Sequence, residues 1–122
     1  MVRPDGHGVW IDAGHAVPFW LETDLGTETL SRVVGKLGGY AALPPSRAYP
    51  VLFWFPTAAR ELNVHAYLTR TRVPDGVTVA TADAASTAST GGPAGPVWRV
   101  AGQPGRVSLA ELTTPDGAVW DG

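Results

Sequence analysis

The run VLFWF at residues 51–55 is the feature that most restricts the fold of this chain. All of its residues are apolar, and it is far shorter than the roughly 20 apolar residues of a membrane-spanning helix. A short strand that is apolar on both faces is typical of a sheet interior covered by helices. We therefore expect residues 51–55 to form the central strand of such a sheet.

The segments around this run alternate between strand-like and helix-like patterns. Residues 7–13 and 16–24 are aromatic and β-branched and predict a hairpin, with Ala13-Gly14-His15 as its turn. Pro18 then indicates an edge position or a bulge. Periodicity further predicts helices at residues 27–43 and 57–70 and a strand at residues 77–80. The alternation favours an α/β fold, a mixed β-sheet flanked by helices.

The first of these helices carries three glycines, Gly35, Gly38 and Gly39. Each costs about 1 kcal/mol relative to Ala in a helix interior. Thr27 is the expected N-cap of this helix. Either packing holds the helix together, or the glycines permit the close approach of another backbone.

The apolar side chains of the second helix and of the strands are interpreted as core. In the second helix we expect Leu62, His65, Ala66 and Leu68 to face inward. The Trp and Phe residues lie mainly within apolar strands, which favours core packing over a base-stacking platform.

The C-terminal third begins with residues 82–96, which are rich in Ala, Ser, Thr, Gly and Pro and have no apolar period. This composition predicts a flexible loop rather than a domain boundary. Residues 97–100 and 107–112 are expected to pack back onto the sheet. At 122 residues the chain has the length of one domain, so residues 1–122 are predicted to form a single domain.

Several function classes find no support in the composition. The chain has no Cys, which excludes disulfides and thiolate metal sites and fits the cytoplasmic location that we expect. No targeting or membrane segment is visible. His7, His15 and His65 lack the spacing of a zinc site. The sequence also has neither a Gly-rich phosphate loop nor a nucleophile elbow, so nucleotide hydrolysis and acyl transfer have no candidate residues.

The charge distribution is acidic at one end of the chain. The net charge of −2 is unlike that of a domain that binds duplex DNA by itself, which usually has a basic surface. Five of the eleven acidic residues fall in the first 28 positions. Such an acidic pole is expected where divalent cations are recruited. The alternative is that the acids lie along a solvated edge.

Within that pole, Glu22 and Asp24 follow an apolar strand. Because they are two residues apart, both side chains point to one face of the strand. Asp24 and Glu28 also suit a turn and a helix start, but Glu22 directly follows Trp20-Leu21 and fits such a role poorly. Glu22 is therefore the strongest candidate for a functional carboxylate.

Asp5 and Lys36 complete the set of candidates. Asp5 stands in a Pro-Asp-Gly tripeptide that recurs at residues 74–76 and 115–117, where a tight turn explains it. Only the first copy lies upstream of the hairpin. Glu28, Arg32 and Lys36 follow one another at i, i+4 spacing, which is typical of a solvated helix face. A rotated helix could instead point the Lys36 ammonium at the carboxylates.

These elements resemble the PD-(D/E)XK nuclease arrangement, and more narrowly the replication-relaxation family of plasmid and mobile-element proteins. The resemblance rests on Pro4-Asp5-Gly6, on the acidic stretch at residues 22–28 and on Lys36-Leu37-Gly38-Gly39-Tyr40. It implies a restriction-endonuclease-like fold. Asp24 stands where the nuclease signature has Lys, and in some enzymes of this kind the catalytic Lys has moved to the following helix, the place of Lys36.

The resemblance implies a DNA-processing accessory domain for plasmid or mobile-element replication or relaxation. In the enzymatic interpretation, a Mg²⁺-dependent DNA endonuclease, Asp5, Glu22 and Asp24 hold Mg²⁺ or Mn²⁺, and Lys36 steadies the attacking water or the phosphate. In the alternative, the module is catalytically inactive and binds DNA or protein. Family members carry a winged-helix region ahead of this half, so DNA binding is expected from an additional domain or subunit, within a replication or mobilisation complex and without a membrane partner.

Overall fold

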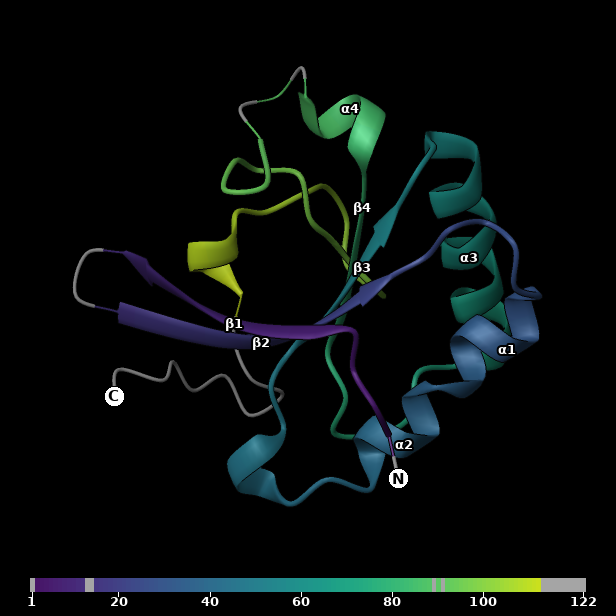
Figure 1. Cartoon of the computed structure of the whole chain (residues 1–122), viewed down its shortest axis with the longest axis horizontal. Helices are drawn as coiled ribbons and strands as arrows, with labels where there is room; N and C mark the ends of the chain where they lie inside the picture. Colours follow the sequence, from purple (N-terminus) through teal and green to yellow (C-terminus); the bar gives the residue numbers. More distant parts are fainter. Residues whose placement is uncertain (1, 13–14, 89, 91, 113–122) are drawn as a thin grey trace.

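The computed structural model describes residues 2–12, 15–88, 90 and 92–112. Within these residues the chain forms a five-stranded sheet in the order β1-β2-β3-β4-β5 (Figure 1). The strands are β1 (Gly6–Asp12), β2 (His15–Thr23), β3 (Val51–Phe55), β4 (Val79–Asp83) and β5 (Arg99–Val100). β2, β3 and β4 run parallel, whereas β1 and β5 pair antiparallel at the two edges. The predicted mixed α/β sheet and the central position of β3 are thus confirmed.

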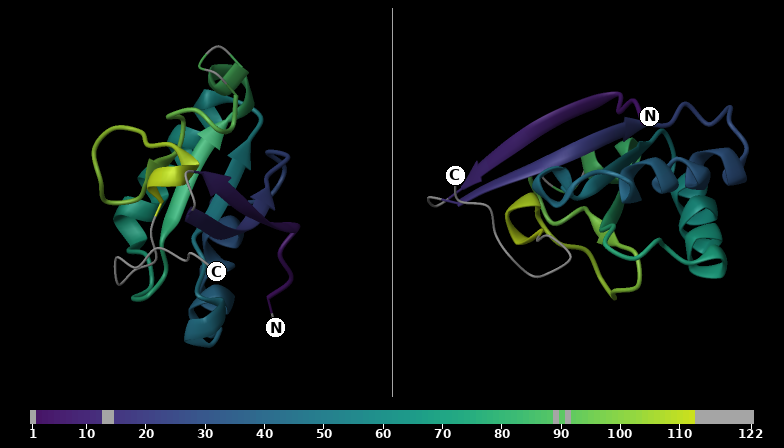
Figure 2. Two further views of the ribbon diagram at one scale, coloured as in Figure 1. Left: turned by 90° about the vertical axis from the view of Figure 1, so that its left-hand side faces the viewer. Right: turned by 90° about the horizontal axis from the view of Figure 1, so that it is seen from below.

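The two parallel connections carry the main helices. β2 leads to β3 through α1 (Leu30–Gly35), α2 (Leu37–Ala41) and the 3-10 turn η1 (Pro45–Arg47), and β3 leads to β4 through α3 (Ala58–Thr71). α1, α2 and α3 lie on one side of the sheet, and the 3-10 turn η2 (Leu109–Glu111) lies on the other (Figures 1 and 2). The helix expected at residues 57–70 is α3, which begins after Thr57, and the Thr57 side chain accepts a hydrogen bond from the Arg60 amide.

Side-chain alternation divides the core between the two faces of the sheet. On β3, Val51, Phe53 and Phe55 pack toward the helices, whereas Leu52 packs toward the C-terminal segment. Trp98 and Val107 form a bridge on that second face, and residues 97–100 and 107–112 pack back onto the sheet as predicted. The helix side of the sheet is the side that receives Glu22 and Asp24.

The helix expected at residues 27–43 starts later and is broken. Its N-cap is Thr29, not Thr27; α1 ends at Gly35, α2 begins at Leu37, and Lys36 is the cap residue between them. The Lys36 amide bonds the Val33 carbonyl, one residue short of helical spacing, so the helix tightens between the glycines. A Cβ on Gly39 would lie 2.7 Å from the Val2 Cβ, so this glycine permits the close approach of the N-terminal segment.

The loop expected at residues 82–96 was only partly correct. β4 continues to Asp83, and the short helix α4 (Ala84–Ala88) follows directly. The Asp83 carboxylate accepts a hydrogen bond from the Ser86 amide at 2.8 Å, which organises the start of α4. Ala13 and Gly14 of the expected hairpin turn lie outside the described residues, and none of the described helices is long and apolar enough to cross a membrane.

Candidate carboxylate–lysine site

The end of β2 places two acids beneath the helices. Glu22 pairs in register with Phe53 of β3, and both Glu22 and Asp24 lie on the helix side, as their two-residue spacing predicts. Glu22 is 2% exposed and Asp24 is 5% exposed. Carboxylates so deeply buried need charged or hydrogen-bonding partners. The partners of the two acids are different.

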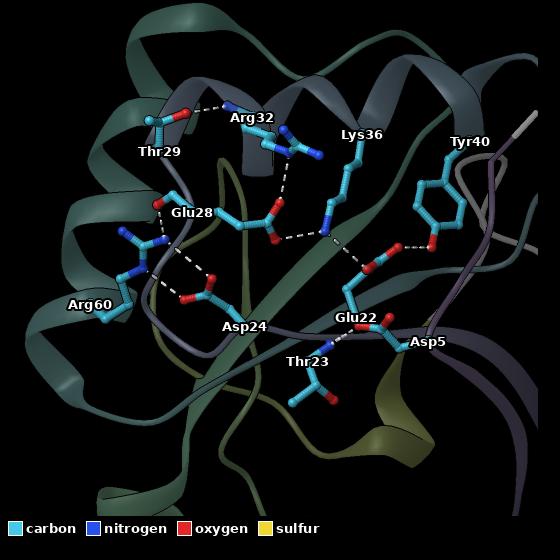
Figure 3. Close-up of polar contacts among 10 residues, drawn as sticks. All are labelled: Asp5, Glu22, Thr23, Asp24, Glu28, Thr29, Arg32, Lys36, Tyr40 and Arg60. Carbon is cyan, nitrogen blue, oxygen red and sulfur yellow. Dashed lines mark hydrogen bonds and ion pairs between the residues drawn. The ribbon is translucent and has the colours of Figure 1, made fainter.

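Asp5 reaches Glu22 from the neighbouring strand. Because β1 runs antiparallel to β2 with Gly6 opposite Leu21, Asp5 stands beside the end of β2. Its Oδ2 accepts a hydrogen bond from the Thr23 amide at 2.8 Å, and its carboxylate lies next to that of Glu22 (Figure 3). The structure therefore brings Asp5 and Glu22 together.

Helices α1 and α2 close the site from above. Tyr40 Oη donates a 2.5 Å hydrogen bond to Glu22 Oε1, and Lys36 Nζ lies 3.7 Å from Glu22 Oε2 (Figure 3). The same Lys36 Nζ donates to Glu28 Oε1 at 3.0 Å, and Arg32 bonds the other oxygen of Glu28. The Lys36 ammonium thus points at the carboxylates and bridges Glu22 and Glu28.

Burial and charge act in opposite directions on these groups. Burial raises the pKa of Glu22 above its usual range; Tyr40 and Lys36 oppose this shift, whereas the nearby Asp5 adds to it. Burial alone would lower the pKa of Lys36, but the hydrogen bond to Glu28 and the charges of Glu22, Glu28 and Asp5 raise it. Burial and Glu22 raise the pKa of Tyr40. The site therefore holds a protonated Tyr40 and a charged Lys36 against an acidic pair.

Asp24 belongs to a different contact. Arg60 of α3 donates to it twice, from Nε to Oδ2 at 2.7 Å and from Nη2 to Oδ1 at 3.1 Å. The same Nη2 donates to the Glu28 carbonyl at 2.6 Å. Arg60 was not among the site residues predicted from the sequence, and its position in the first turn of α3 is a local signal for it. It connects Asp24 with the loop that leads to α1.

The residues fit a metal ion only in part. Among the described residues, no group of three or more His, Asp or Glu side chains is placed to hold a metal ion. Both oxygens of Asp24 are bonded to Arg60, so Asp24 does not suit the role of ligand. Asp5 and Glu22 remain as adjacent carboxylates, which are the donors that hard divalent cations prefer. The predicted catalytic and metal-binding roles of Asp5, Glu22, Asp24 and Lys36 stay predictions.

A second buried polar cluster lies at the other edge of the parallel strands. Glu61 of α3 is 2% exposed and accepts two hydrogen bonds from Arg106, at 2.8 and 2.9 Å. Thr81 of β4 also donates to Glu61 at 2.6 Å, and His65 Nδ1 lies 3.3 Å from the Thr81 hydroxyl. This cluster fastens the C-terminal segment to α3 and β4. It is separate from the carboxylate–lysine site, which consists of Asp5, Glu22, Lys36 and Tyr40.

Comparison with known proteins gives one result for this chain. Residues 1–50 match the family model described as Replication-relaxation. No curated protein and no solved structure gives a significant match. The matched region contains Asp5, Glu22, Lys36 and Tyr40, so it covers the carboxylate–lysine site and ends just before β3. This part of the chain is therefore similar to the replication-relaxation family.

Proposed function

We propose that the chain is a DNA-processing accessory domain in the replication or relaxation of plasmids or mobile elements. The observation that carries this proposal is that one matched segment supplies every member of the cluster Asp5, Glu22, Lys36 and Tyr40. The buried Glu22 lies next to the exposed Asp5 and beside a lysine, and burial and charge shift the pKa values of Glu22 and Lys36, an arrangement frequent in functional sites. A restriction-endonuclease-like organisation of the sheet belongs to the same proposal.

In the enzymatic form of the proposal, Asp5 and Glu22 would hold Mg²⁺ or Mn²⁺. The metal would supply Lewis acidity toward a phosphoryl oxygen and a lowered pKa of its water. Lys36 lies beside Glu22, so its ammonium would be within reach of a phosphate bound at this site. Tyr40 would fix the orientation of the Glu22 carboxylate through its hydrogen bond. DNA would be delivered by a further domain or subunit, within a replication or mobilisation complex.

The second candidate is a nuclease-like module that binds DNA or protein and cuts nothing. The observation that favours it is the state of Asp24, which stands in the place of the signature Lys and is bonded to Arg60. Lys36 is also engaged by Glu28 at 3.0 Å. In this form of the proposal the charged groups stabilise the fold and have no catalytic role.

Metal binding is the first test. Millimolar Mg²⁺ or Mn²⁺ should raise the melting temperature, since a ligand that binds the native state stabilises it by mass action. Glu22→Gln, which keeps an acceptor for Tyr40, should remove this shift. Asp75→Asn serves as the control because the Asp75 side chain is 92% exposed and distant in sequence from the site. A wild type without any metal response would remove the metal from the proposal.

Cleavage is the second test and separates the two candidates. The domain should be fused to a DNA-binding domain and incubated with supercoiled plasmid and Mn²⁺. The enzymatic form predicts nicking or relaxation that Asp5→Ala, Glu22→Ala and Lys36→Ala each abolish without loss of DNA binding. A fusion that binds DNA and never cuts it would establish the inactive module instead.

A further inference from the structure

An aromatic stack lies beside the carboxylate–lysine site and opens to solvent. The Trp20 and Tyr49 rings stack with centroids 5.1 Å apart and an interplanar angle of 29°. The His7 ring stacks on Tyr49 at 6.4 Å and 23°, and lies 5.5 Å from Trp20. Trp20 is buried, Tyr49 is half-buried and His7 is exposed. The stack therefore runs from the core to the surface.

This stack is continuous with the candidate site. His7 stands opposite Trp20 in the β1–β2 register, and Asp5 and Glu22 are each two residues from one of them, so these side chains belong to the same side of the sheet. The Tyr40 ring lies 6.5 Å from Trp20, while its hydroxyl bonds Glu22. A ligand on the exposed end of the stack would thus lie close to the carboxylates.

A cation accompanies the rings. The Arg47 guanidinium lies 5.1 Å from the centre of the Trp20 ring, and the Arg47 carbonyl accepts a 3.0 Å hydrogen bond from Trp20 Nε1. Arg47 is exposed, and no carboxylate of the described residues forms an ion pair with it. Its position is fixed by Trp20, but its charge is available to a ligand. Aromatic faces with a neighbouring guanidinium are the combination by which proteins hold unpaired nucleotides.

We propose that His7, Tyr49 and Arg47 form a binding platform for single-stranded DNA that leads the strand to Asp5 and Glu22. Stacking needs bases that are free of a duplex, and it adds to the attraction between the backbone phosphates and a cation such as Arg47. The net charge of −2 leaves the chain without the basic footprint that duplex binding requires. The choice of DNA rests on the proposed function, whereas the stacking site rests on the geometry alone.

Binding of the 122-residue chain to labelled oligonucleotides tests the proposal. Fluorescence anisotropy would compare a 12-nucleotide thymidine strand with a duplex of equal length, in EDTA so that metal and cleavage play no part. We expect preferential binding of the single strand. His7→Ala should weaken it by about fivefold to 100-fold, the usual effect of removing one base-stacking ring, and His7→Tyr should restore it. Arg47→Ala should reduce the slope of the logarithm of the binding constant against the logarithm of the salt concentration by about one, the effect of one lost phosphate contact.

The chain offers a matched control on α3, where the Arg70 guanidinium lies 5.5 Å from the Tyr67 ring. Tyr67→Ala removes another aromatic ring that lies beside an arginine, outside the proposed platform, and should leave the affinity unchanged. Equal binding of duplex and single strand, no binding at all, or an unchanged affinity in His7→Ala would overturn the proposal. Tighter binding of the matching RNA strand would overturn the assignment to DNA. Because the assay contains no metal, binding can succeed even where the cleavage test fails.

Discussion

Arg60 holds Asp24 through two hydrogen bonds across 36 residues of sequence, and this pair fixes the boundary of the carboxylate–lysine site. The Asp24 side chain is 3% exposed and the Arg60 side chain 16%. The guanidinium also bonds the Glu28 carbonyl, so one residue of α3 positions both the end of β2 and the approach to α1. Glu28 in turn holds Lys36.

Arg60→Ala should strongly destabilise the protein. The substitution leaves the Asp24 carboxylate buried without its cation, a change that costs about 3–5 kcal/mol in buried ion pairs. Chemical denaturation would measure the loss in the free energy of unfolding. Arg70→Ala on the exposed part of the same helix is the control and should change stability by less than about 0.5 kcal/mol. Similar losses for the two variants would show that the Asp24 contact contributes little.

Tyr40→Phe should raise the pKa of Glu22 further. The Tyr40 hydrogen bond favours the charged carboxylate and lowers its pKa, so its removal lets burial dominate. Loss of a hydrogen bond to a buried charged group should also cost roughly 1.5–3 kcal/mol of stability. Carboxyl carbon NMR titration would report the pKa, with Tyr67→Phe as control. An unchanged or lower Glu22 pKa in Tyr40→Phe would contradict the role assigned to this hydrogen bond.

Local sequence patterns predicted the secondary-structure elements whose residues pack regularly, but they failed where contacts between residues far apart in the sequence decide which side chains are buried. The apolar run of β3 and the periodicity of α3 are local signals, and both were interpreted correctly. In α3, however, Leu62 and Ala66 were expected to face inward and are exposed, Leu62 to 60%, whereas Glu61 is buried. Arg106, 45 residues away, makes that burial favourable, and no pattern within the helix reveals it.

The same distinction applies to the candidate site. The shared face of Glu22 and Asp24 follows from strand alternation. For Lys36, a solvated helix face and a direction toward the carboxylates were both open, and in the structure its Nζ lies 3.7 Å from Glu22 Oε2. The partner of Asp24 could not be predicted, because Arg60 meets it only after β3 and α3 have packed together. Asp24 was therefore grouped with the metal ligands from its spacing to Glu22 and from the nuclease resemblance. Its bonds to Arg60 separate it from the Asp5–Glu22 pair.

Gly8→Ala should destabilise the hairpin and displace an aromatic ring. A Cβ on Gly8 would lie 2.6 Å from the Phe19 Cζ, closer than atoms can approach, whereas a Cβ on Gly6 would meet Leu21 at an ordinary 3.6 Å. Phe19 also lines an apolar groove with Trp54 and Trp98. We expect Gly8→Ala to cost about 1–3 kcal/mol as an overpacked contact, with a changed near-ultraviolet spectrum. Gly6→Ala is the matched control, and an equal effect of both would refute the steric explanation.

Acidification should weaken the fold through His65. This residue is 6% exposed, and burial, together with the charges of Arg99 and Arg106, lowers its pKa, while Glu61 opposes the shift. Below the ordinary histidine pKa of about 6.5, the unfolded chain binds a proton that the native state does not. Stability therefore falls as the pH drops below that value and continues to fall until the lowered native pKa is reached.

Thermal unfolding at pH 7.5 and pH 5.5 would measure the effect as a difference between variants. The pKa of Glu22 is raised above its ordinary value of 4.5, so this residue makes the protein more stable, not less, as the pH falls toward that value. The wild type and His65→Gln share this contribution, and it cancels when the two are compared. His65→Gln should therefore lose less stability than the wild type between the two pH values. His7→Gln controls for the removal of a histidine from the surface. Equal flattening in both variants, or none in His65→Gln, would show that the buried His65 is not the source of the acid sensitivity.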